Sequence, residues 1–272
     1  MANSRAIVDA SAVEVSLARP PRRIVSLVPS ITEILFALGV GPSVAGCTIY
    51  CTEPRDALAG VPRIGGEKNP KLDAIRDLGA DLVVANVEEN VREHVETLRG
   101  WGIPVFVCYP RTVAAGIRLV RDLGLLAGAA EQGDAIASAL EACLASALAR
   151  RAGAEPSRVF CPIWRKPYMT INADTYIHDM LRAAGGDNVF GGLDVRYPEV
   201  TLDDVARARP DVILLPDEPY RFRASHAADF HAYADMPAVE GGRIHLVDGK
   251  LLSWYGPRIE EALRVLPPLL AR

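Results

Sequence analysis

The sequence predicts an α/β protein of two lobes, each with a parallel sheet, joined by a single long connecting helix. Short β-branched runs alternate with segments of helical periodicity, an order that is typical of βαβ units. One such stretch occurs twice in the chain. Between the two copies lies a segment that is almost free of strand signals and rich in Ala and Leu.

The first half of the chain begins with a βαβ pattern and continues in the same order. Strands are expected over Arg23–Val28, Ser43–Gly46, Asp81–Ala85 and Pro104–Tyr109, and helices over Ile31–Leu38, Lys71–Leu78 and Val91–Trp101. Ser30 is the expected N-cap of the first helix, with Glu33 as its capping-box partner three residues on.

The second half of the chain repeats the alternation of strands and helices. Strands are expected over Arg158–Phe160, Asp211–Leu215 and Arg243–Val247, and helices over Thr175–Ala184 and Leu202–Ala208. The first of these helices is expected to end at Gly185, because glycine is the usual residue after a helix terminus.

Two segments are similar in amino-acid sequence as well as in the order of their helix and strand. A Leu-Asp pair opens a helix at Asp73 and again at Asp203, and a strand opens with Asp81 and again with Asp211. In both copies the second aspartate follows the first by eight residues. Such self-similarity predicts two similar lobes rather than one continuous sheet.

The segment Thr112–Gly153 separates the two copies. Its second part, Ala130–Arg151, has high helix propensity apart from Gly133, and as a helix would span about 33 Å. It is either a surface helix of one lobe or a stiff connector that leaves a cleft and restricts hinge opening. We favour the connector, which divides the chain into residues 1–111, 112–156 and 157–272.

Composition and charge exclude several classes of protein. Half of the 272 residues are hydrophobic, as in an ordinary globular chain. The net charge of -4 gives no excess of positive charge with which to bind nucleic acid. No apolar run reaches about 18 residues, so the chain is not expected to span a membrane. Its N-terminus lacks the apolar region of a secretory signal, so the protein stays in the cytoplasm or its export signal is missing from this chain.

No catalytic residues, metal site or cofactor are expected. The chain lacks GxSxG, GxxxxGK[ST] and HExxH motifs, and no GxGxxG follows the first strand. Cys47 and Cys51 stand four residues apart, which is the spacing of half a metal site, but no companion pair of ligands exists. We therefore expect both cysteines to be small buried hydrophobic residues.

The opening of the chain resembles one family. Asp9, the alternating Val13, Val15 and Leu17, and the run PPRRIVSLVPSITE ending at Glu33 are similar to the start of the helical-backbone (cluster A, class III) substrate-binding proteins of ABC importers. The likeness continues through Lys71–Val84, Gly102–Val107, Gly185–Phe190, Tyr197–Val205 and Pro257–Ile259, and so covers essentially the whole chain. It is strongest to the cobalamin-binding branch.

The resemblance implies two Rossmann-like lobes and a protein that captures a corrinoid or metal chelate, such as an iron–siderophore complex or haem, in the interlobe cleft. It implies an ABC permease as partner and a periplasmic or cell-surface location, with the mature domain complete and only the export signal absent. One alternative is a cytoplasmic chaperone or sensor for the same ligands. Another is an enzyme on a nitrogenase-like scaffold, but the cysteines show no cluster spacing.

Ligands of two-lobed α/β proteins lie beyond the carboxyl ends of the strands. Tyr50, Trp164 and Tyr197 stand where the cobalamin branch places aromatic contacts, so the resemblance implies that these rings touch the ligand. Trp254 precedes Gly256 in an expected loop and joins them as a candidate. For each ring the alternative is packing in the core.

Two loops depart from that branch, which has tryptophans where this chain has Ile64-Gly65-Gly66 and the run Asn86–Asn90. These loops make Glu67 and Glu89 candidate ligand contacts and favour a ligand with hydrogen-bonding or cationic groups, such as a different corrinoid or a metal chelate. The alternative is that Glu89 caps the helix that follows, since carboxylates suit a helix N-terminus.

Asp73 and Asp203 have a second implied role. In the family an acidic residue on the outer rim of each lobe pairs with arginines of the permease, and these aspartates stand at the matching positions. Their local role is to stabilise the first turn of a helix, worth about 0.3–1 kcal/mol each. The two roles are compatible.

Overall fold

The structure is a computed structural model that describes residues 5–271, which form two compact units. Unit 1 comprises Met1–Pro110, Ala115–Ala139 and Tyr255–Pro257, and unit 2 comprises Arg111–Ala114, Leu140–Trp254 and Arg258–Arg272. Residues 1–4 and 272, which fall within the predicted segments 1–111 and 157–272, lie outside the described part. The three-segment division of the chain stays a prediction.

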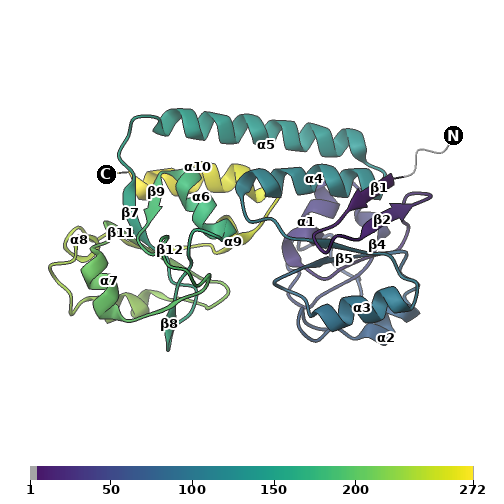
Figure 1. Ribbon diagram of the computed structural model, residues 1–272, viewed down its shortest axis with the longest axis horizontal. Helices are drawn as coiled ribbons and strands as arrows, with labels where there is room; N and C mark the ends of the chain where they lie inside the picture. The colour runs from purple at the N-terminus through teal and green to yellow at the C-terminus, as the bar shows by residue number, and fades with distance from the viewer. Residues whose placement is uncertain (1–4, 272) are drawn as a thin grey trace. The chain divides into compact units, whose positions relative to one another are not determined.

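Unit 1 contains a small hairpin and an α/β layer structure (Figure 1). Its strands are β1 (Arg5–Val8), β2 (Glu14–Leu17), β3 (Ile24–Ser26), β4 (Val44–Cys47), β5 (Leu82–Asn86) and β6 (Val105–Cys108). Its helices are α1 (Pro29–Ala37), the 3-10 turn η1 (Gly41–Ser43), α2 (Leu72–Asp77), α3 (Arg92–Gly100) and most of α4 (Val113–Ala127).

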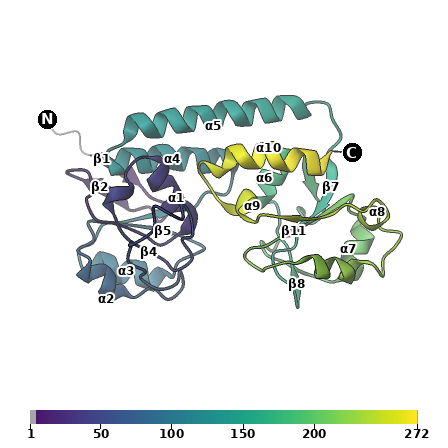
Figure 2. The same ribbon diagram turned by 180° about the vertical axis from the view of Figure 1, so that it is seen from behind.

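The main sheet of unit 1 has the strand order β4-β3-β5-β6, and all of its pairs are parallel. Every residue of β5 and β6 is buried, as expected for strands that are covered on both faces. Helices α2 and α3 lie on one side of this sheet, and α1 and α4 on the other (Figures 1 and 2).

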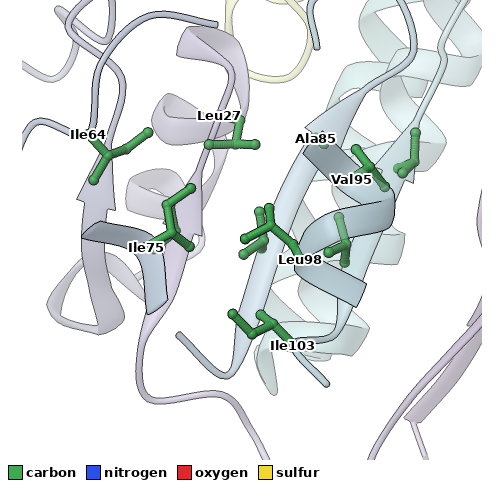
Figure 3. Close-up of a cluster of buried hydrophobic side chains, with 11 residues drawn as sticks. Leu27, Ile64, Ile75, Ala85, Val95, Leu98 and Ile103 are labelled. Carbon is green, nitrogen blue, oxygen red and sulfur yellow. The ribbon is translucent and has the colours of Figure 1, made fainter. Parts of the chain in front are cut away.

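A cluster of aliphatic side chains joins α2 and α3 to the sheet (Figure 3). Ile75 of α2 and Leu98 of α3 are fully buried against Val83 of β5 and Val105 of β6. Burial of each such side chain stabilises the fold by about 1.5–3 kcal/mol. This face therefore fixes the strands whose carboxyl ends carry the candidate site.

Unit 2 repeats the layered arrangement. Its strands are β7 (Ser157–Phe160), β8 (Tyr168–Met169), β9 (Gly186–Asn188), β10 (Glu199–Val200), β11 (Val212–Pro216) and β12 (Ile244–Val247). Its helices are α6 (Tyr176–Ala184), α7 (Leu202–Ala208), the 3-10 helix η2 (Ala224–Phe230), α8 (Pro237–Glu240), α9 (Lys250–Ser253) and α10 (Arg258–Leu270).

The main sheet of unit 2 has the order β12-β11-β7-β9, again with parallel pairs throughout. Numbered along the chain within each unit, both sheets have the order 2-1-3-4. A second small sheet pairs β8 with β10 in antiparallel fashion. The core on one face of the main sheet is built around Phe160 of β7, whose ring meets those of Phe190 and Phe230 edge-on.

Hydrogen bonds confirm the predicted repeat. The Asp81 carboxylate accepts the backbone N–H groups of Arg22 and Arg23 at 2.9 and 2.8 Å, just before β3. The Asp211 carboxylate accepts the N–H of Arg158 at 2.9 Å, just inside β7. In both units the aspartate that precedes the third strand thus ties it to the start of the first strand.

The long helix α5 (Ala130–Arg151) has the predicted bounds, and the boundary between the two units falls within it, after Ala139. Its Gly133 lies against Gly124 of α4, where a Cβ atom added to Gly124 would lie 3.0 Å from the Cα of Gly133. The single weak helix former in α5 therefore permits close packing of two helices. In residues 5–271 no helix has the length and hydrophobicity to cross a bilayer.

The predicted cap of the first helix is wrong. Helix α1 begins at Pro29, Val28 is its N-cap residue, and no side chain caps it. Proline suits the first helical position because its φ is already helical and it has no N–H to satisfy. Ser30 lies inside the helix and is buried. By contrast, α6 ends as predicted at Gly185, whose φ of 102° is left-handed.

Candidate functional site

The carboxyl ends of the unit 1 strands lead into three loops that carry candidate residues. Thr48–Tyr50 follows β4, residues 87–91 follow β5, and residues 65–69 precede α2. Asn90 holds two of these loops together. Its side-chain amide donates to the carbonyl oxygens of Glu67 and Leu27 at 3.1 and 3.3 Å, and its Oδ1 accepts the N–H of Asn86 at 2.8 Å.

Tyr50 lies on the same edge with 56% of its surface exposed. A Cβ atom added to Gly66 would lie 3.3 Å from Cε2 of the Tyr50 ring, so the ring rests against the backbone of the 65–69 loop. A glycine at position 66 therefore leaves room for the tyrosine ring. Tyr50 and Glu67 are brought together through this loop.

A lysine lies among the acidic residues of this edge. Lys68 donates through Nζ to the carbonyl oxygen of Glu88. Burial raises the pKa of the Glu89 carboxyl, and the charge of Lys68 opposes that shift. Glu89 is thus a partly desolvated acid, and its backbone N–H, together with that of Glu88, donates to Oδ1 of Asn86. Asn86 thus caps the turn, whereas within residues 5–271 the Glu89 carboxylate makes no hydrogen bond or ion pair.

In unit 2 the small β8–β10 sheet positions two aromatic candidates. Trp164 forms an antiparallel bridge with Met169 of β8, and its ring is 44% exposed. It meets the ring of Tyr220 edge-on at 5.5 Å. Tyr197 is half-buried two residues before β10, with the guanidinium of Arg196 5.4 Å from its ring.

A charged network supports the loop of Trp164. Arg165 donates Nε and Nη2 to the two carboxylate oxygens of Asp229 at 2.6 and 2.9 Å, and the Tyr168 hydroxyl donates to the same carboxylate at 2.6 Å. The Arg165 hydrogen bonds lower the pKa of Asp229 to about 2. Asp229 is therefore ionised at every physiological pH, and the bidentate pair fixes the orientation of Arg165.

Trp254 differs from the other rings because it is buried, with 6% of its surface exposed. The cationic groups of Lys250 and Arg258 each lie 5.8 Å from its ring. Its neighbour Glu218 accepts a hydrogen bond from the Ser253 hydroxyl at 3.2 Å, and burial raises the pKa of the Glu218 carboxyl. These surroundings agree with the alternative given for Trp254, packing in the core.

The two aspartates with a predicted docking role are both exposed in the first turns of corresponding helices, Asp73 in α2 and Asp203 in α7. Asp73 pairs with Arg76 at 2.7 Å, and Asp203 accepts the hydroxyl of Tyr233 at 2.6 Å. The repeat therefore places one exposed carboxylate at the same position of each unit.

Within residues 5–271 no group of three or more His, Cys, Asp and Glu side chains is arranged to hold a metal ion. Cys47 and Cys51 are buried beside Leu58, as predicted for small hydrophobic residues. Their sulfur atoms also have polar neighbours, since Arg63 donates Nη1 to Cys47 Sγ at 3.0 Å. That contact had no signal in the sequence, because sixteen residues separate the two side chains.

Comparison with known proteins gives consistent matches. A sequence profile of the periplasmic binding protein family matches residues 24–251. The vitamin B12-binding protein of Vibrio cholerae is 25% identical over 249 residues, covering 90% of this chain and 87% of the relative. An uncharacterized ABC transporter substrate-binding lipoprotein of Bacillus subtilis, YvrC, is 26% identical over 265 residues, covering 95% and 82%.

Solved structures show the same fold. The crystal structure of the Vibrio cholerae periplasmic vitamin B12 binding protein matches with a TM-score of 0.82 at 24% identity, covering 92% of this chain and 96% of that one. The apo form of a periplasmic heme-binding protein from Roseiflexus matches with a TM-score of 0.78 at 27% identity, covering 91% and 98%. These similarities cover the two parallel sheets and the helices around them.

Proposed function

The chain belongs to the periplasmic binding protein family, and from that premise we propose that it captures a corrinoid or related metal chelate for an ABC importer. The proposal places the mature protein outside the cytoplasmic membrane, in the periplasm or at the cell surface. The relatives named for vitamin B12, heme and ABC transport support this class of ligand. The capture is noncovalent, and the protein acts as a binding protein rather than as an enzyme.

One observation carries the choice of ligand class: exposed aromatic rings lie beyond the carboxyl ends of the strands in both units, Tyr50 in unit 1 and Trp164 in unit 2. A large apolar ring exposed to water is a contact surface rather than a core residue. Flat macrocycles such as corrins and porphyrins pack against such rings. We propose Tyr197 as a third contact and Trp254, which is buried, as a residue that shapes the site.

The charge of the unit 1 edge favours a corrinoid over heme. Glu67 and Glu89 lie on this edge together with Lys68. The amide side chains of a corrinoid donate hydrogen bonds that carboxylates accept, whereas the propionates of heme are anions that these carboxylates repel. We therefore propose Glu67 and Glu89 as acceptors for amide groups of the ligand.

Titration of the purified protein with cyanocobalamin, cobinamide, hemin and a ferric siderophore tests the proposal, read by calorimetry and visible absorption. Saturable binding is expected for the corrinoids, with Tyr50→Ala and Trp164→Ala each weakening it by about tenfold. Trp101→Ala is the matched control, since Trp101 is an exposed tryptophan at the end of α3 that packs on Arg76. Failure of all four compounds to bind would overturn the proposed function.

Corrinoid binding is expected to weaken on acidification because the ionised Glu89 carboxylate accepts stronger amide hydrogen bonds than the protonated acid. Its raised pKa means that binding falls at a higher pH than an ordinary carboxyl would give. Glu89→Gln is expected to weaken binding by about fivefold at pH 7 and to flatten this pH dependence. Glu93→Gln, an exposed first-turn residue of α3, is the control. The same pH profile in wild type and Glu89→Gln would contradict the assignment.

We also propose that Asp73 and Asp203 contact the permease, supported by their equivalent exposed positions in the two units. Reversing both charges, Asp73→Arg with Asp203→Arg, is expected to reduce ligand uptake by cells that contain the cognate permease and ATPase by at least tenfold. Ligand binding by the purified variant is expected to stay unchanged. Normal uptake by the double variant would contradict the docking role.

A further inference from the structure

Two buried thiols bracket the turn that presents Tyr50. Cys47 is the last residue of β4, Cys51 follows the turn Thr48–Tyr50, and both side chains are almost wholly buried. The two side chains belong to one buried cluster with Leu58. Both cysteines are free, and the turn between them exposes the side chains of Ile49 and Tyr50.

The surroundings of these sulfur atoms are polar, unlike those of a cysteine that only fills space. The hydroxyl oxygens of Thr32 and Thr48 lie 3.1 and 3.2 Å from Cys51 Sγ. Arg63 Nη1 donates to Cys47 Sγ at 3.0 Å. Interaction with the Cys47 thiol and the hydrogen bonds of Thr32 and Thr48 lower the pKa of the Cys51 thiol, although burial opposes that shift. A guanidinium and hydroxyl groups around a thiol pair stabilise the thiolate, which is the reactive form.

Arg63 also fixes the backbone of the turn. The same Nη1 donates to the carbonyl oxygens of Thr48 and Cys51 at 3.0 and 2.7 Å. Cys47 is held by the sheet, since its N–H donates to Pro62 and its carbonyl accepts the N–H of Ile64, both at 3.0 Å. A change in the distance between the two sulfur atoms must therefore be taken up by the turn and by Cys51.

From this geometry we propose that Cys47 and Cys51 form a reversible disulfide with a peroxide as oxidant. The Cys51 thiolate attacks one oxygen of hydrogen peroxide, the O–O bond breaks, and the departing hydroxide takes a proton to become water. The Cys47 thiol then gives up its proton and attacks the resulting sulfenic sulfur, whose hydroxyl leaves as a second water. Two thiols and one peroxide thus give one disulfide and two waters.

The disulfide is expected to alter the turn. Its sulfur atoms are about 2.05 Å apart, closer than two separate thiols can approach, and neither sulfur keeps a proton. Because Cys47 is anchored, Thr48–Tyr50 moves and the contact of Tyr50 with Gly66 changes. On the proposed function, oxidation of this pair therefore changes the affinity for the ligand.

Peptide mapping tests the disulfide directly. Cys47 and Cys51 share the tryptic peptide Ile24–Arg55, which contains no internal Lys or Arg, whereas Cys108, Cys143 and Cys161 each fall in a different peptide. After treatment of the reduced protein with hydrogen peroxide and blocking with N-ethylmaleimide, this peptide is expected to lack label and to be about 2 Da lighter, reversibly with dithiothreitol. Full labelling of both cysteines, or oxidation confined to Cys143, would overturn the proposal.

Single-residue variants test the individual parts of the proposed disulfide chemistry. Cys143→Ser, which changes the half-buried thiol of α5, is expected to leave disulfide formation unchanged. Arg63→Gln, which removes the donor to Cys47 Sγ, is expected to slow the second step, the attack of Cys47 on the sulfenic sulfur of Cys51, at pH 7; an unchanged rate of disulfide formation would contradict the role of Arg63. Ligand affinity is then compared between the oxidised and reduced protein. A disulfide that leaves affinity unchanged removes the coupling but not the redox site, and absence of ligand binding by both forms rejects only the proposed function.

Discussion

Replacing Asp9 by alanine is expected to lower the free energy of unfolding by about 3 kcal/mol, because it removes the acceptor of a buried network. Oδ1 accepts the N–H and hydroxyl of Ser11 and the N–H of Val13 at 2.8, 2.7 and 3.1 Å. Oδ2 accepts Nη2 of Arg99 at 2.6 Å and the N–H of Val107 at 3.0 Å. The Asp9 side chain is completely buried, so no water replaces it.

Lowering the pH is expected to reduce the contribution of the Asp9 network to the free energy of unfolding. Burial by itself raises the pKa of Asp9, but the hydrogen bonds from Ser11, Val13 and Val107 lower it overall. A carboxyl with a lowered folded-state pKa stabilises the fold above its unfolded value of about 3.9 and loses that stabilisation as the pH falls through the folded value. Urea unfolding at pH 7 and below pH 4 measures the effect.

The difference in the free energy of unfolding between wild type and Asp9→Ala should therefore be largest at neutral pH and should become smaller below pH 4. Glu14→Ala, an exposed carboxylate on the same hairpin, is the matched control and is expected to change stability by less than about 0.5 kcal/mol. A loss below about 1 kcal/mol for Asp9→Ala at pH 7 would show that the network does not hold the hairpin to β6.

The sequence predicted those parts of the fold that have a local pattern. Most strands of the main sheets that consist of β-branched and aliphatic runs, such as Asp81–Ala85, lie within one residue of their predicted ends, whereas the strand predicted over Arg23–Val28 ends two residues early, at Ser26. Strand β9 (Gly186–Asn188) was not predicted, because its three residues include no β-branched side chain and follow directly on the glycine that ends α6. Its place in the sheet is decided by its partner β7.

The candidate site could be predicted only where chain order fixes position. Residues that directly follow a parallel strand must lie at its carboxyl end, which is why Tyr50 and Glu89 could be named from the sequence. Asn90, which joins loops 23 residues apart, and Asp229, which pairs with Arg165 across 64 residues, have no such signal. Contacts of this kind depend on tertiary packing. The burial of Trp254 is a second example, since its neighbours come from the ends of two helices.

Asp229 is the second residue whose loss should have a large effect. Asp229→Ala leaves the guanidinium of Arg165 and the hydroxyl of Tyr168 without their shared acceptor. Both groups of the ion pair are about one-fifth exposed, so water partly replaces the carboxylate. We expect the free energy of unfolding to fall by about 2 kcal/mol, as for the loss of hydrogen bonds to a charged group. Urea unfolding followed by circular dichroism measures this loss.

The pH dependence of this pair has the same sign as that of Asp9, because the folded-state pKa of each carboxyl is lowered. The pKa of Asp229 is lowered to about 2 by its hydrogen bonds with Arg165, so the carboxylate is ionised at both pH 4 and pH 8. The loss of unfolding free energy caused by Asp229→Ala should therefore be nearly the same at these two values, because a stabilisation of this sign is lost as the pH falls from the unfolded-state pKa of about 3.9 through the lowered folded-state pKa. Asp235→Ala, an exposed aspartate six residues on, should be neutral.

The same variant also connects stability to the site. Arg165 directly follows Trp164, whose exposed ring is a proposed ligand contact, and Tyr168 lies on the strand that pairs with the Trp164 segment. If the ion pair positions this loop, Asp229→Ala should weaken corrinoid binding even under conditions in which the variant is fully folded, whereas Asp229→Asn, which keeps one acceptor oxygen, should weaken it less. Equal affinity of wild type and Asp229→Ala would show that the ion pair stabilises unit 2 without orienting Trp164.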